Sequence, residues 1–412
     1  MTKIQFIHCG DLHIGTNVYN NIERKRDFVL SLKDMAEYAI EQKVDFVIIS
    51  GDFFNKKQID PDALEGAMEV LSILKVAKID VIVIEGNHDT SIYTEDISWL
   101  YFLSKKEYLK LLQTKFIKGE PIISKWNSKS KIGSYLDFGE IRIFGVGYLG
   151  ASTKKKIELL EPHLNPSKFN IMMLHASINS MLYSDLGGIK KEDISIIKNK
   201  IDYLALGHIH KKYEIDNWIF NPGSLENWRL NEALYKKGFF HITLDSNKIK
   251  NVEFKESKRR PVYLWNVDIT GCKDSNDVYK KVINFIEKNK PSVKPSKNPI
   301  ISLTYIGKVD FSTLQIDNNF IKKEIEEKLN PLICEIKDGV NILTSAGKAV
   351  VLPSKNEIEK EEIGKLIDLN PEYKKNKDMI TNLILSFKAK ALSGLDEDEL
   401  IGLVQNNLND LK

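Results

Sequence analysis

The chain has 412 residues and a net charge of only +3, and its apolar and charged fractions, 42% and 28%, are those of a globular protein. This length predicts two or three domains. No apolar run is long enough to cross a bilayer, and the first residues lead into a strand-like stretch, so we expect no secretory signal. The three cysteines are far apart, which argues against a disulfide framework or a thiolate zinc site. We therefore expect a cytoplasmic protein.

The first 245 or so residues alternate short apolar runs with helical patterns. We expect strands at 4–9, 44–50, 80–86, 141–147, 170–175, 202–207, 217–221 and 239–245. We expect helices between them, for example at 27–42, 61–77 and 97–112. Strands that alternate with helices predict an α/β fold.

The pattern changes near residue 258. A strand begins in "RRPVYLWNVDIT", and a helix at 274–289, a strand at 300–306, a helix at 317–329 and a strand at 332–337 follow. These elements predict a small α+β unit, and the rest of the chain reads as helices at 356–367, 376–391 and 396–409. The expected domains are 1–257, 258–350 and 351–412.

Side chains that can bind metals follow the predicted strands of the first domain. They are Asp11 and His13 in "GDLH", Asp52 in "GDFFN", Asn87 and His88 in "GNHD", His175 in "MMLHA", and His208 and His210 in "GHIH". Open α/β sheets place ligands at the carboxyl ends of their strands. Carboxylate, amide and imidazole ligands together favour Mn, Fe, Co or Zn over Ca or Mg.

Taken alone, a D-x-H or H-x-H motif often binds nothing, and Asn-His-Asp after a strand can be a simple turn. Of the eight histidines, however, only His163 and His241 lie outside these strand ends, so the ordered set is specific as a whole. His8 comes too early in the first motif to be a ligand, and we interpret it as a core or supporting histidine. A carboxylate between two cations can bridge them, and Asp52 is the natural candidate.

The ordered motifs resemble those of the calcineurin-like metallophosphoesterase superfamily. Within it, the closing segment "NPGSLENWRL" and the units that follow resemble the SbcD-type (meiotic recombination eleven) DNA double-strand-break repair nucleases. The resemblance implies an α/β fold, a metallophosphoesterase β-sandwich flanked by helices, with a small α+β DNA-capping domain and a helical C-terminal tail. It also implies a homodimer, for which the helices in 61–77 and 91–112 are candidates, although their apolar faces could equally be core.

The resemblance also implies two divalent metal ions, with Mn²⁺ the expected metal. One ion would be held by Asp11, His13, Asp52 and His210, and the other by Asp52, Asn87, His175 and His208. His88 would be the catalytic residue that contacts the scissile phosphate or protonates the leaving oxygen. Many relatives carry a supporting His or Asp three residues after the bridging aspartate, where this chain has Asn55, which cannot relay a proton. This departure leaves the strength of exonuclease activity open.

The expected function is that of a metal-dependent DNA exonuclease and endonuclease subunit of a double-strand-break repair complex. One alternative is another metallophosphoesterase, a phosphodiesterase or phosphatase that does not act on DNA. Protein phosphatases of the superfamily carry Asp and Arg just after the second motif, and "GDFFNKK" has neither. A non-catalytic scaffold is the other alternative, but scaffolds of this kind typically lose ligands.

Basic residues near the metal ligands and in the second unit are the expected DNA contacts: Lys56, Lys57, Arg259, Arg260 and the loop 289–299. The competing interpretation is a solvated face of a lysine-rich chain. In the tail, Ile380, Leu383, Ile384 and Phe387 follow the spacing of one helix face. The resemblance implies that this tail, which Leu395, Leu400 and Leu403 extend, binds an SMC-like ABC-type ATPase of the SbcC type, whereas the alternative is that it folds back on the capping unit.

Overall fold

The computed structural model describes residues 3–91, 97–178, 188–291, 296–342, 355–368 and 373–392. Its first part is built on two facing sheets. In spatial order, the seven-stranded sheet contains β15 (Lys248–Glu256), β14 (Gly238–Asp245), β1 (Lys3–Cys9), β2 (Phe46–Ile49), β3 (Asp80–Val83), β4 (Lys110–Leu112) and β7 (Ile132–Gly133). The six-stranded sheet contains β12 (Tyr213–Ile215), β13 (Ile219–Asn221), β11 (Tyr203–Gly207), β10 (Phe169–His175), β9 (Ile141–Tyr148) and β8 (Tyr135–Phe138). A small hairpin joins β5 (Lys115–Ile117) and β6 (Glu120–Ile122).

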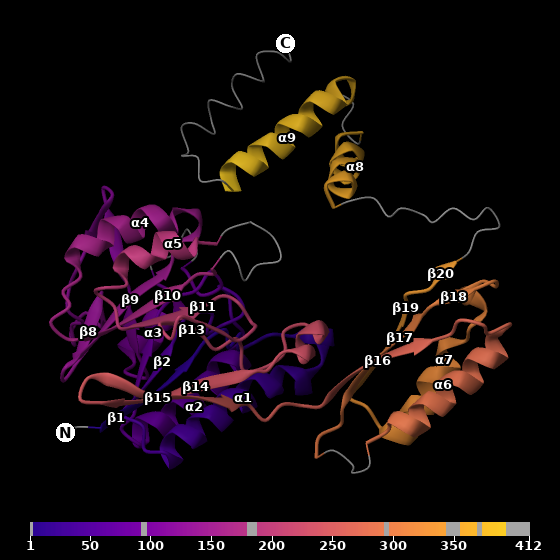
Figure 1. Cartoon of the computed structure of the whole chain (residues 1–412), viewed down its shortest axis with the longest axis horizontal. Coiled ribbons are helices and arrows are strands. Elements are labelled where there is room, and N and C mark those ends of the chain that lie inside the picture. Colours follow the sequence, from indigo (N-terminus) through magenta and orange to yellow (C-terminus); the bar gives the residue numbers. More distant parts are fainter. Residues whose placement is uncertain are drawn as a thin grey trace.

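Helices cover both outer faces of this sandwich (Figure 1). They are α1 (Ile22–Glu41), α2 (Pro61–Val76) and α3 (Trp99–Lys105) on the seven-stranded sheet, and α4 (Thr153–Leu160) and α5 (Lys191–Ile194) on the six-stranded one. Between the sheets, Phe6 and Phe46 of one pack in the same core as Ile143 and Met173 of the other. The expected fold class, a β-sandwich flanked by helices, is confirmed.

Strand β2, in the centre of its sheet, is apolar along its whole length because both of its faces are covered. All four residues of β2 are buried, and β2 pairs in parallel with β1 and β3. Polar caps fix where the covering helices begin: the side chain of Asn21 accepts from backbone N–H groups of α1, and that of Asp60 does so for α2, which has Pro61 in its first turn. Because β1, β2 and β3 run parallel, their carboxyl ends lie side by side along one edge of the sandwich.

The predicted helix at 97–112 is wrong in its second half. The helix ends at Lys105, Glu107 has φ 63°, and Leu111 pairs with Val83 of β3 as part of β4. An apolar run this short fits a helix or a buried strand equally well, so periodicity alone could not separate them. The sequence reading also missed β15, which follows a tight turn at Ser246 and Asn247, with φ values of 52° and 58°, as in a type I′ hairpin.

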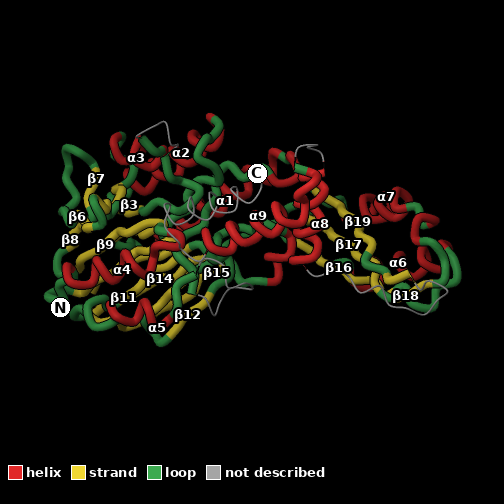
Figure 2. Tube along the Cα trace, turned by 90° about the horizontal axis from the view of Figure 1, so that it is seen from above, coloured by secondary structure: helices red, strands yellow, loops and turns green. Residues whose placement is uncertain are grey.

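A second, smaller sheet follows β15. Its parallel strands are β16 (Val262–Asp268), β17 (Ile300–Ile306) and β19 (Ile333–Asp338), and a short pair joins β18 (Lys308–Val309) to β20 (Asn341–Ile342). Two helices, α6 (Ser275–Asn289) and α7 (Asn318–Leu329), lie against one face of the sheet (Figure 1), and Figure 2 shows the same elements from above. Trp265, Leu303, Ile286 and Ile321 form part of its core, which is separate from those of the sandwich.

Two helices of the C-terminal part are described, α8 (Lys355–Asp368) and α9 (Lys377–Leu392), and they contact each other. They correspond to the helices expected at 356–367 and 376–391. The expected helix at 396–409, with Leu395, Leu400 and Leu403, lies outside the described residues. Over the part of the chain that is described, no helix has the length and apolar character needed to cross a membrane.

Candidate metal centre

Five strands from the two sheets carry the metal-capable side chains to one edge of the sandwich. In the first sheet, Asp11 and His13 follow β1, Asp52 follows β2, and Asn87 and His88 follow β3. In the second sheet, β10 ends at His175, and β11 is followed by His208 and His210. The sequence reading placed these residues at strand ends, and the two sheets bring them together.

One group of side chains comes from β1 and β11. The ligand atoms of Asp11, His13 and His210 all lie within 4.8 Å of one another. The Nε2 atoms of His13 and His210 are 3.0 Å apart. Imidazole nitrogens about 2.1 Å from a shared cation at a right angle would have about this separation. The spacing therefore fits a metal ion between them.

A second group surrounds Asn87. The ligand atoms of Asp52, His175 and His208 also lie within 4.8 Å of one another. Asn87 Oδ1 is 3.2 Å from His175 Nε2 and 3.1 Å from His208 Nδ1. Asp52 Oδ2 is 3.2 Å from His175 Nε2 and 3.8 Å from His13 Nε2, so one carboxylate oxygen lies between the two groups. Together the two groups suit a dinuclear metal site.

Burial sets the charge state of this edge. Asp11, His13, Asp52 and His175 are each no more than 2% exposed. Burial lowers the pKa of His13, and it lowers the pKa of His208 to about 4, which favours the neutral form of the ring that metal ligation requires. Burial opposes protonation of His175 too, but Asp52 outweighs it and raises the pKa of His175 to about 9. The buried carboxylates of Asp11 and Asp52 lie close together, and such an arrangement is stable only if positive charge compensates them. Metal cations would supply that charge.

The backbone of this edge is held in unusual conformations. The φ values of Asp11, His13, Asp52 and His208 are 51°, 47°, 51° and 89°, in the left-handed region that residues with a Cβ rarely adopt. Such strain clusters at functional sites and persists because the surrounding structure enforces it. At Gly86 there is no room for a side chain, because a Cβ atom would lie 2.2 Å from Asp52 Oδ1. The turns are therefore shaped to present these side chains.

A family comparison agrees with this geometry. Residues 4–212, about half of the chain, match the calcineurin-like phosphoesterase family. The chain belongs to this family. The match begins in β1 and includes every residue of the two ligand groups.

Individual relatives of this phosphoesterase were also found. A DNA double-strand break repair protein Mre11 from Archaeoglobus fulgidus is 32% identical over 238 residues, covering 56% of this chain and 52% of the relative. A protein of the same name from Methanococcus maripaludis is 28% identical over 415 residues and covers 97% of each chain. Among solved structures, a dimetal phosphatase from Danio rerio covers 62% of this chain and 96% of its own at 13% identity, but its TM-score of 0.39 is too low to inform fold or function.

Groups behind the ligands orient two of the rings of this phosphoesterase. His175 Nδ1 donates to the backbone oxygen of Ser50, at 2.8 Å, which leaves Nε2 facing the site. His210 Nδ1 lies 2.9 Å from Glu232 Oε1, and the other carboxylate oxygen of Glu232 accepts from Lys237 Nζ at 2.7 Å. Although burial opposes it, His210 and Lys237 lower the pKa of Glu232 to about 2. Glu232 and Lys237 could not be predicted from the sequence, because neither belongs to a motif at the end of a strand.

His88 is held by the main chain. Its Nδ1 lies 2.7 Å from the backbone oxygen of Asn55, and its own N–H donates to Asp52 Oδ1 at 2.9 Å. A carbonyl oxygen only accepts, so Nδ1 carries the proton and Nε2 is available to a substrate. The main-chain carbonyl of Asn55, and not its side chain, therefore holds the His88 ring. A ring nitrogen of His88 also lies within 4.8 Å of ligand atoms of His13 and Asp52, so His88 could itself bind an ion. Its assignment as the catalytic rather than a ligating histidine stays a prediction.

Two aromatic residues that the sequence reading did not single out flank the site. The indole of Trp228 stacks on the His13 ring, with centroids 5.2 Å apart and planes 3° from parallel. The ring of Tyr148, at the end of β9, lies 5.8 Å from that of His208. Each aromatic ring thus packs against a ligand of a different group and limits its movement.

The predicted DNA contacts differ in accessibility. Lys56 and Lys57 are exposed beside the strand end that carries Asp52. Arg259 is half-buried and donates to Asn227 Oδ1 at 2.8 Å. Arg260 is 5% exposed, and its guanidinium donates to Asp27 at 2.7 Å and to Glu23 at 3.1 Å.

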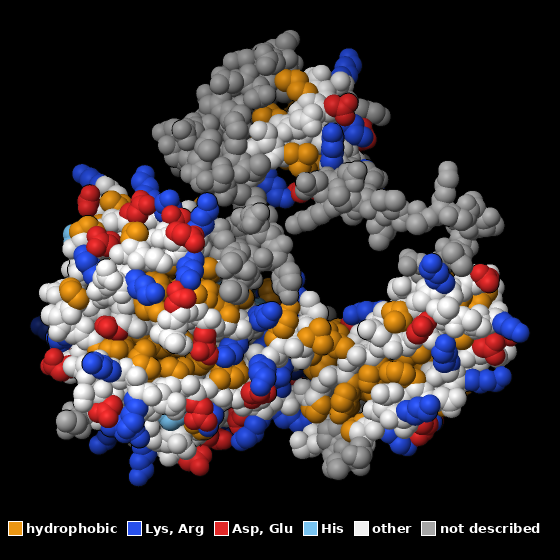
Figure 3. Space-filling view, in the orientation of Figure 1, with side chains coloured by type: hydrophobic (Ala, Val, Ile, Leu, Met, Phe, Trp, Pro, Cys, Tyr) orange, Lys and Arg blue, Asp and Glu red, His pale blue; other side chains and the backbone are white. Residues whose placement is uncertain are grey.

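Arg260 therefore joins the loop before β16 to α1, and these ion pairs compete with any contact to a phosphate. Its assignment as a DNA contact stays a prediction. A basic cluster such as "SKRRP" does not reveal which of its side chains form ion pairs with distant acidic residues. Figure 3 shows basic and acidic side chains interspersed over one face of the molecule, in keeping with the low net charge.

Proposed function

We propose that this phosphoesterase is a metal-dependent DNA exonuclease and endonuclease subunit that acts in double-strand-break repair. The observation that carries the proposal is the position of Asp52, whose Oδ2 lies 3.2 Å from His175 and 3.8 Å from His13, between two complete groups of ligands. That arrangement suits hydrolysis of a phosphate ester. The two relatives named as DNA double-strand break repair proteins support DNA as the substrate.

In this proposal Asp11, His13, Asp52 and His210 hold one cation, and Asp52, Asn87, His175 and His208 hold the other. Two divalent cations there would activate water and neutralise charge that develops on the phosphodiester. With both ring nitrogens protonated, His88 would donate Nε2–H to the scissile phosphate or to the leaving oxygen, while the Asn55 carbonyl accepts from Nδ1–H. Ser50 and Glu232 hold the rings of His175 and His210 toward the ions.

We further propose Mn²⁺ as the metal, since the ligands mix imidazole with carboxylate and amide oxygen. Lys56, Lys57 and Arg259 are the proposed phosphate contacts. Contacts of this kind release counterions, so DNA affinity is expected to fall steeply with salt. A phosphodiesterase or phosphatase that does not act on DNA remains the alternative function.

The proposal includes the organisation of the chain. Residues 1–257 would form the nuclease domain, 258–350 a DNA-capping domain, and 351–412 the region that binds an SMC-like ABC-type ATPase of the SbcC type. A homodimer in the cytoplasm is the proposed state. The separate cores of the sandwich and of the second sheet support the first boundary.

A nuclease assay on linear and hairpin DNA tests the function, with Mn²⁺ or Mg²⁺ and with EDTA, in the presence and absence of the ATPase. Release of nucleotides or nicked DNA that requires a divalent cation is the expected result. Hydrolysis of a simple phosphodiester such as bis-p-nitrophenyl phosphate, without action on any DNA substrate, would favour the alternative instead.

A further inference from the structure

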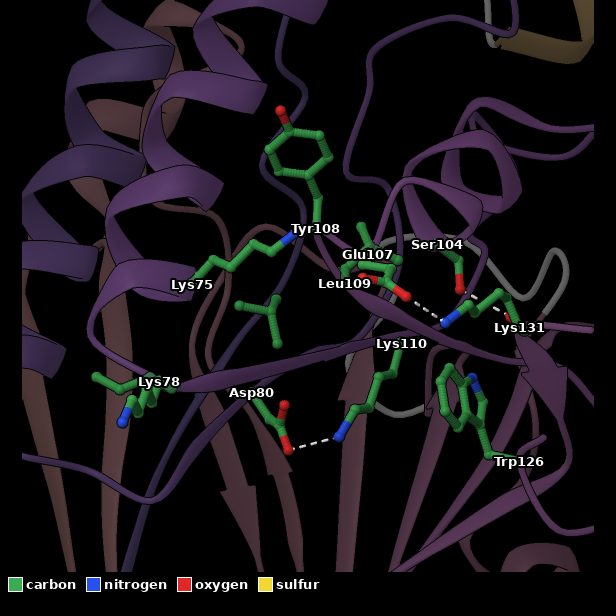
Figure 4. Close-up of a pocket in the computed structure, with 12 residues that line it drawn as sticks. Lys75, Lys78, Asp80, Ser104, Glu107, Tyr108, Leu109, Lys110, Trp126 and Lys131 are labelled. Atoms are coloured by element: carbon green, nitrogen blue, oxygen red, sulfur yellow. Dashed lines mark hydrogen bonds and ion pairs between the residues drawn. The ribbon is translucent and has the colours of Figure 1, made fainter. Parts of the chain in front are cut away.

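A cavity of about 350 Å³ lies at the edge of the seven-stranded sheet opposite the metal ligands. Its lining includes Asp80 and Lys110, the first residues of the parallel strands β3 and β4. Asn87 and His88 follow the other end of β3, so the cavity is separate from the metal centre. Figure 4 shows the side chains that surround it.

Part of the lining is apolar and aromatic. Ile79, Val81 and Leu109 are 7%, 2% and 4% exposed and form apolar lining of the cavity. The rings of Tyr108 and Trp126 also line it, and Figure 4 shows them on different sides. Small-molecule sites typically combine such apolar walls with a few polar groups, and flat rings favour a flat ligand group.

The polar part of the lining carries an excess of positive charge. Lys110 Nζ is 2.6 Å from Asp80 Oδ2, and Lys131 Nζ is 2.6 Å from Glu107 Oε1, so these lysines are paired. The other two, Lys75 and Lys78, form no ion pair with any residue that the structure describes, and both are exposed. Lys75 Nζ instead lies 5.3 Å from the centroid of the Tyr108 ring. Two cationic side chains beside the cavity are thus free to bind an anion.

The indole of Trp126 adds a hydrogen-bond donor without an acceptor. Its Nε1 is buried and has no partner among the described residues. Buried indole N–H groups usually find an acceptor, and one that lacks it is explained by a water, an ion or a ligand. The Nζ atoms of Lys110 and Lys131, each paired with a carboxylate, lie 5.7 and 5.8 Å from the centroid of the Trp126 ring.

We propose that this cavity binds a nucleoside that carries a terminal phosphate monoester. The base would lie against Tyr108 and Trp126, and the phosphate dianion would pair with Lys75 and Lys78. A phosphate monoester matches the two unpaired cations in charge. Two sources share this chemistry, a free mononucleotide and the phosphorylated end of a DNA strand. The binding does not depend on the function proposed above, although a nuclease that releases nucleotides would produce this class of ligand.

Equilibrium dialysis of the full-length protein in EDTA tests the proposal, with deoxyadenosine monophosphate, deoxyadenosine and inorganic phosphate as probes. The monophosphate is expected to bind saturably and more tightly than either fragment. The double variant Lys75→Gln, Lys78→Gln should weaken its binding about tenfold, the effect of about 1.4 kcal/mol. A 5′-phosphorylated oligonucleotide that also loses affinity in the lysine double variant assigns the cavity to strand ends. An oligonucleotide that binds the parent and the double variant equally, while the monophosphate does not, assigns the cavity to free nucleotides.

Lys43→Gln is the matched control. Lys43 is exposed and follows α1 with φ 53°, as Lys78 follows α2 with φ 59°, and it does not line the cavity. The control should bind the monophosphate like the parent, and Trp126→Leu should weaken binding through loss of the ring against which the base would lie. Absence of saturable binding, or equal affinity in the parent and the lysine double variant, would overturn the proposal. Cation-dependent hydrolysis should be unchanged in the double variant, so failure of this site and failure of the proposed nuclease activity give different results.

Discussion

The metal-binding edge and the α8–α9 helix pair differ in where their side chains find partners. At the edge, Asp11, His13, Asp52 and His175 are at most 2% exposed, and residues of both sheets surround them. In the helix pair, Leu366 of α8 is 67% exposed, and Ile384 and Phe387 of α9 are 41% and 38% exposed. The edge is complete within this chain except for its ions, whereas the helix pair leaves large apolar side chains uncovered.

This difference separates two kinds of function in one polypeptide. Chemistry needs groups fixed to within a fraction of an ångström, and here strained turns and buried partners fix them. Docking needs apolar surface that a partner can cover, and such surface stays exposed until the partner binds. Variants of the edge are therefore expected to change hydrolysis and metal content, and variants of the exposed α9 side chains are expected to change neither.

The largest effect should come from Asp52. Asp52→Ala removes the carboxylate that both ligand groups share, so we expect loss of both metal ions and of all detectable hydrolysis. Asn87→Ala removes an oxygen from one group only and should weaken one ion. Metal analysis by mass spectrometry on the same preparations used for the nuclease assay measures both. Equal loss of metal from the two variants would contradict a shared Asp52.

His88→Asn should abolish most hydrolysis and leave metal content intact. A positioned acid or hydrogen-bond donor typically contributes about 10²–10⁴-fold to rate. His163→Asn, at an exposed position outside the ligand groups, is the control and should behave like the parent. If His88→Asn instead loses an ion, the histidine is a ligand, as its closeness to His13 and Asp52 permits.

Arg260→Met tests the junction between the sandwich and the second sheet. The variant leaves Asp27, which is 2% exposed, with one fewer cation, and breaking a buried ion pair costs about 3 kcal/mol. We expect a lower urea midpoint, while Lys258→Met, which removes an 86% exposed side chain from its pair with Asp34, should change it little. An unchanged midpoint together with weaker DNA binding would instead support Arg260 as a DNA contact.

Glu232→Gln should have a smaller effect, a weaker binding of the one metal ion that His210 would hold. Glu232 orients His210, and loss of such a partner typically lowers metal affinity about 10–100-fold. Titration of the metal-free protein should show one weakened site and one unchanged site. Two equally weakened sites would mean that Glu232 stabilises the whole edge rather than His210.

The sequence predicted the metal-capable side chains at the strand ends, but it did not predict the groups that hold them in place. Asp11, His13, Asp52 and His208 lie within a few residues of strands whose apolar runs are easy to recognise, and parallel strands bring their ends together. The Asn55 carbonyl and the Glu232 carboxylate depend on how loops fold in space, which residue identity alone does not encode. Arg260 was interpreted as a DNA contact from its basic neighbours in the sequence. Asp27, with which it forms an ion pair, lies more than two hundred residues earlier, so the local sequence does not reveal the pair.

The smallest effect on hydrolysis is expected from the exposed side of α9. Ion pairs of Lys377 with Asp368 and of Lys388 with Glu359 hold α9 against α8, while Ile380 and Leu383 are only partly exposed. The double variant Ile384→Ser, Phe387→Ser should therefore keep the helix pair and change hydrolysis of a simple phosphodiester less than about twofold, because surface substitutions rarely perturb a distant site. The same variant should lose co-purification with the SMC-like ATPase, whereas Asn382→Ala, an exposed polar position on the same helix, should retain it. If the double variant binds the ATPase normally but melts at a lower temperature, the apolar side chains pack against this chain itself, and the contrast between a self-contained edge and an open docking surface is wrong.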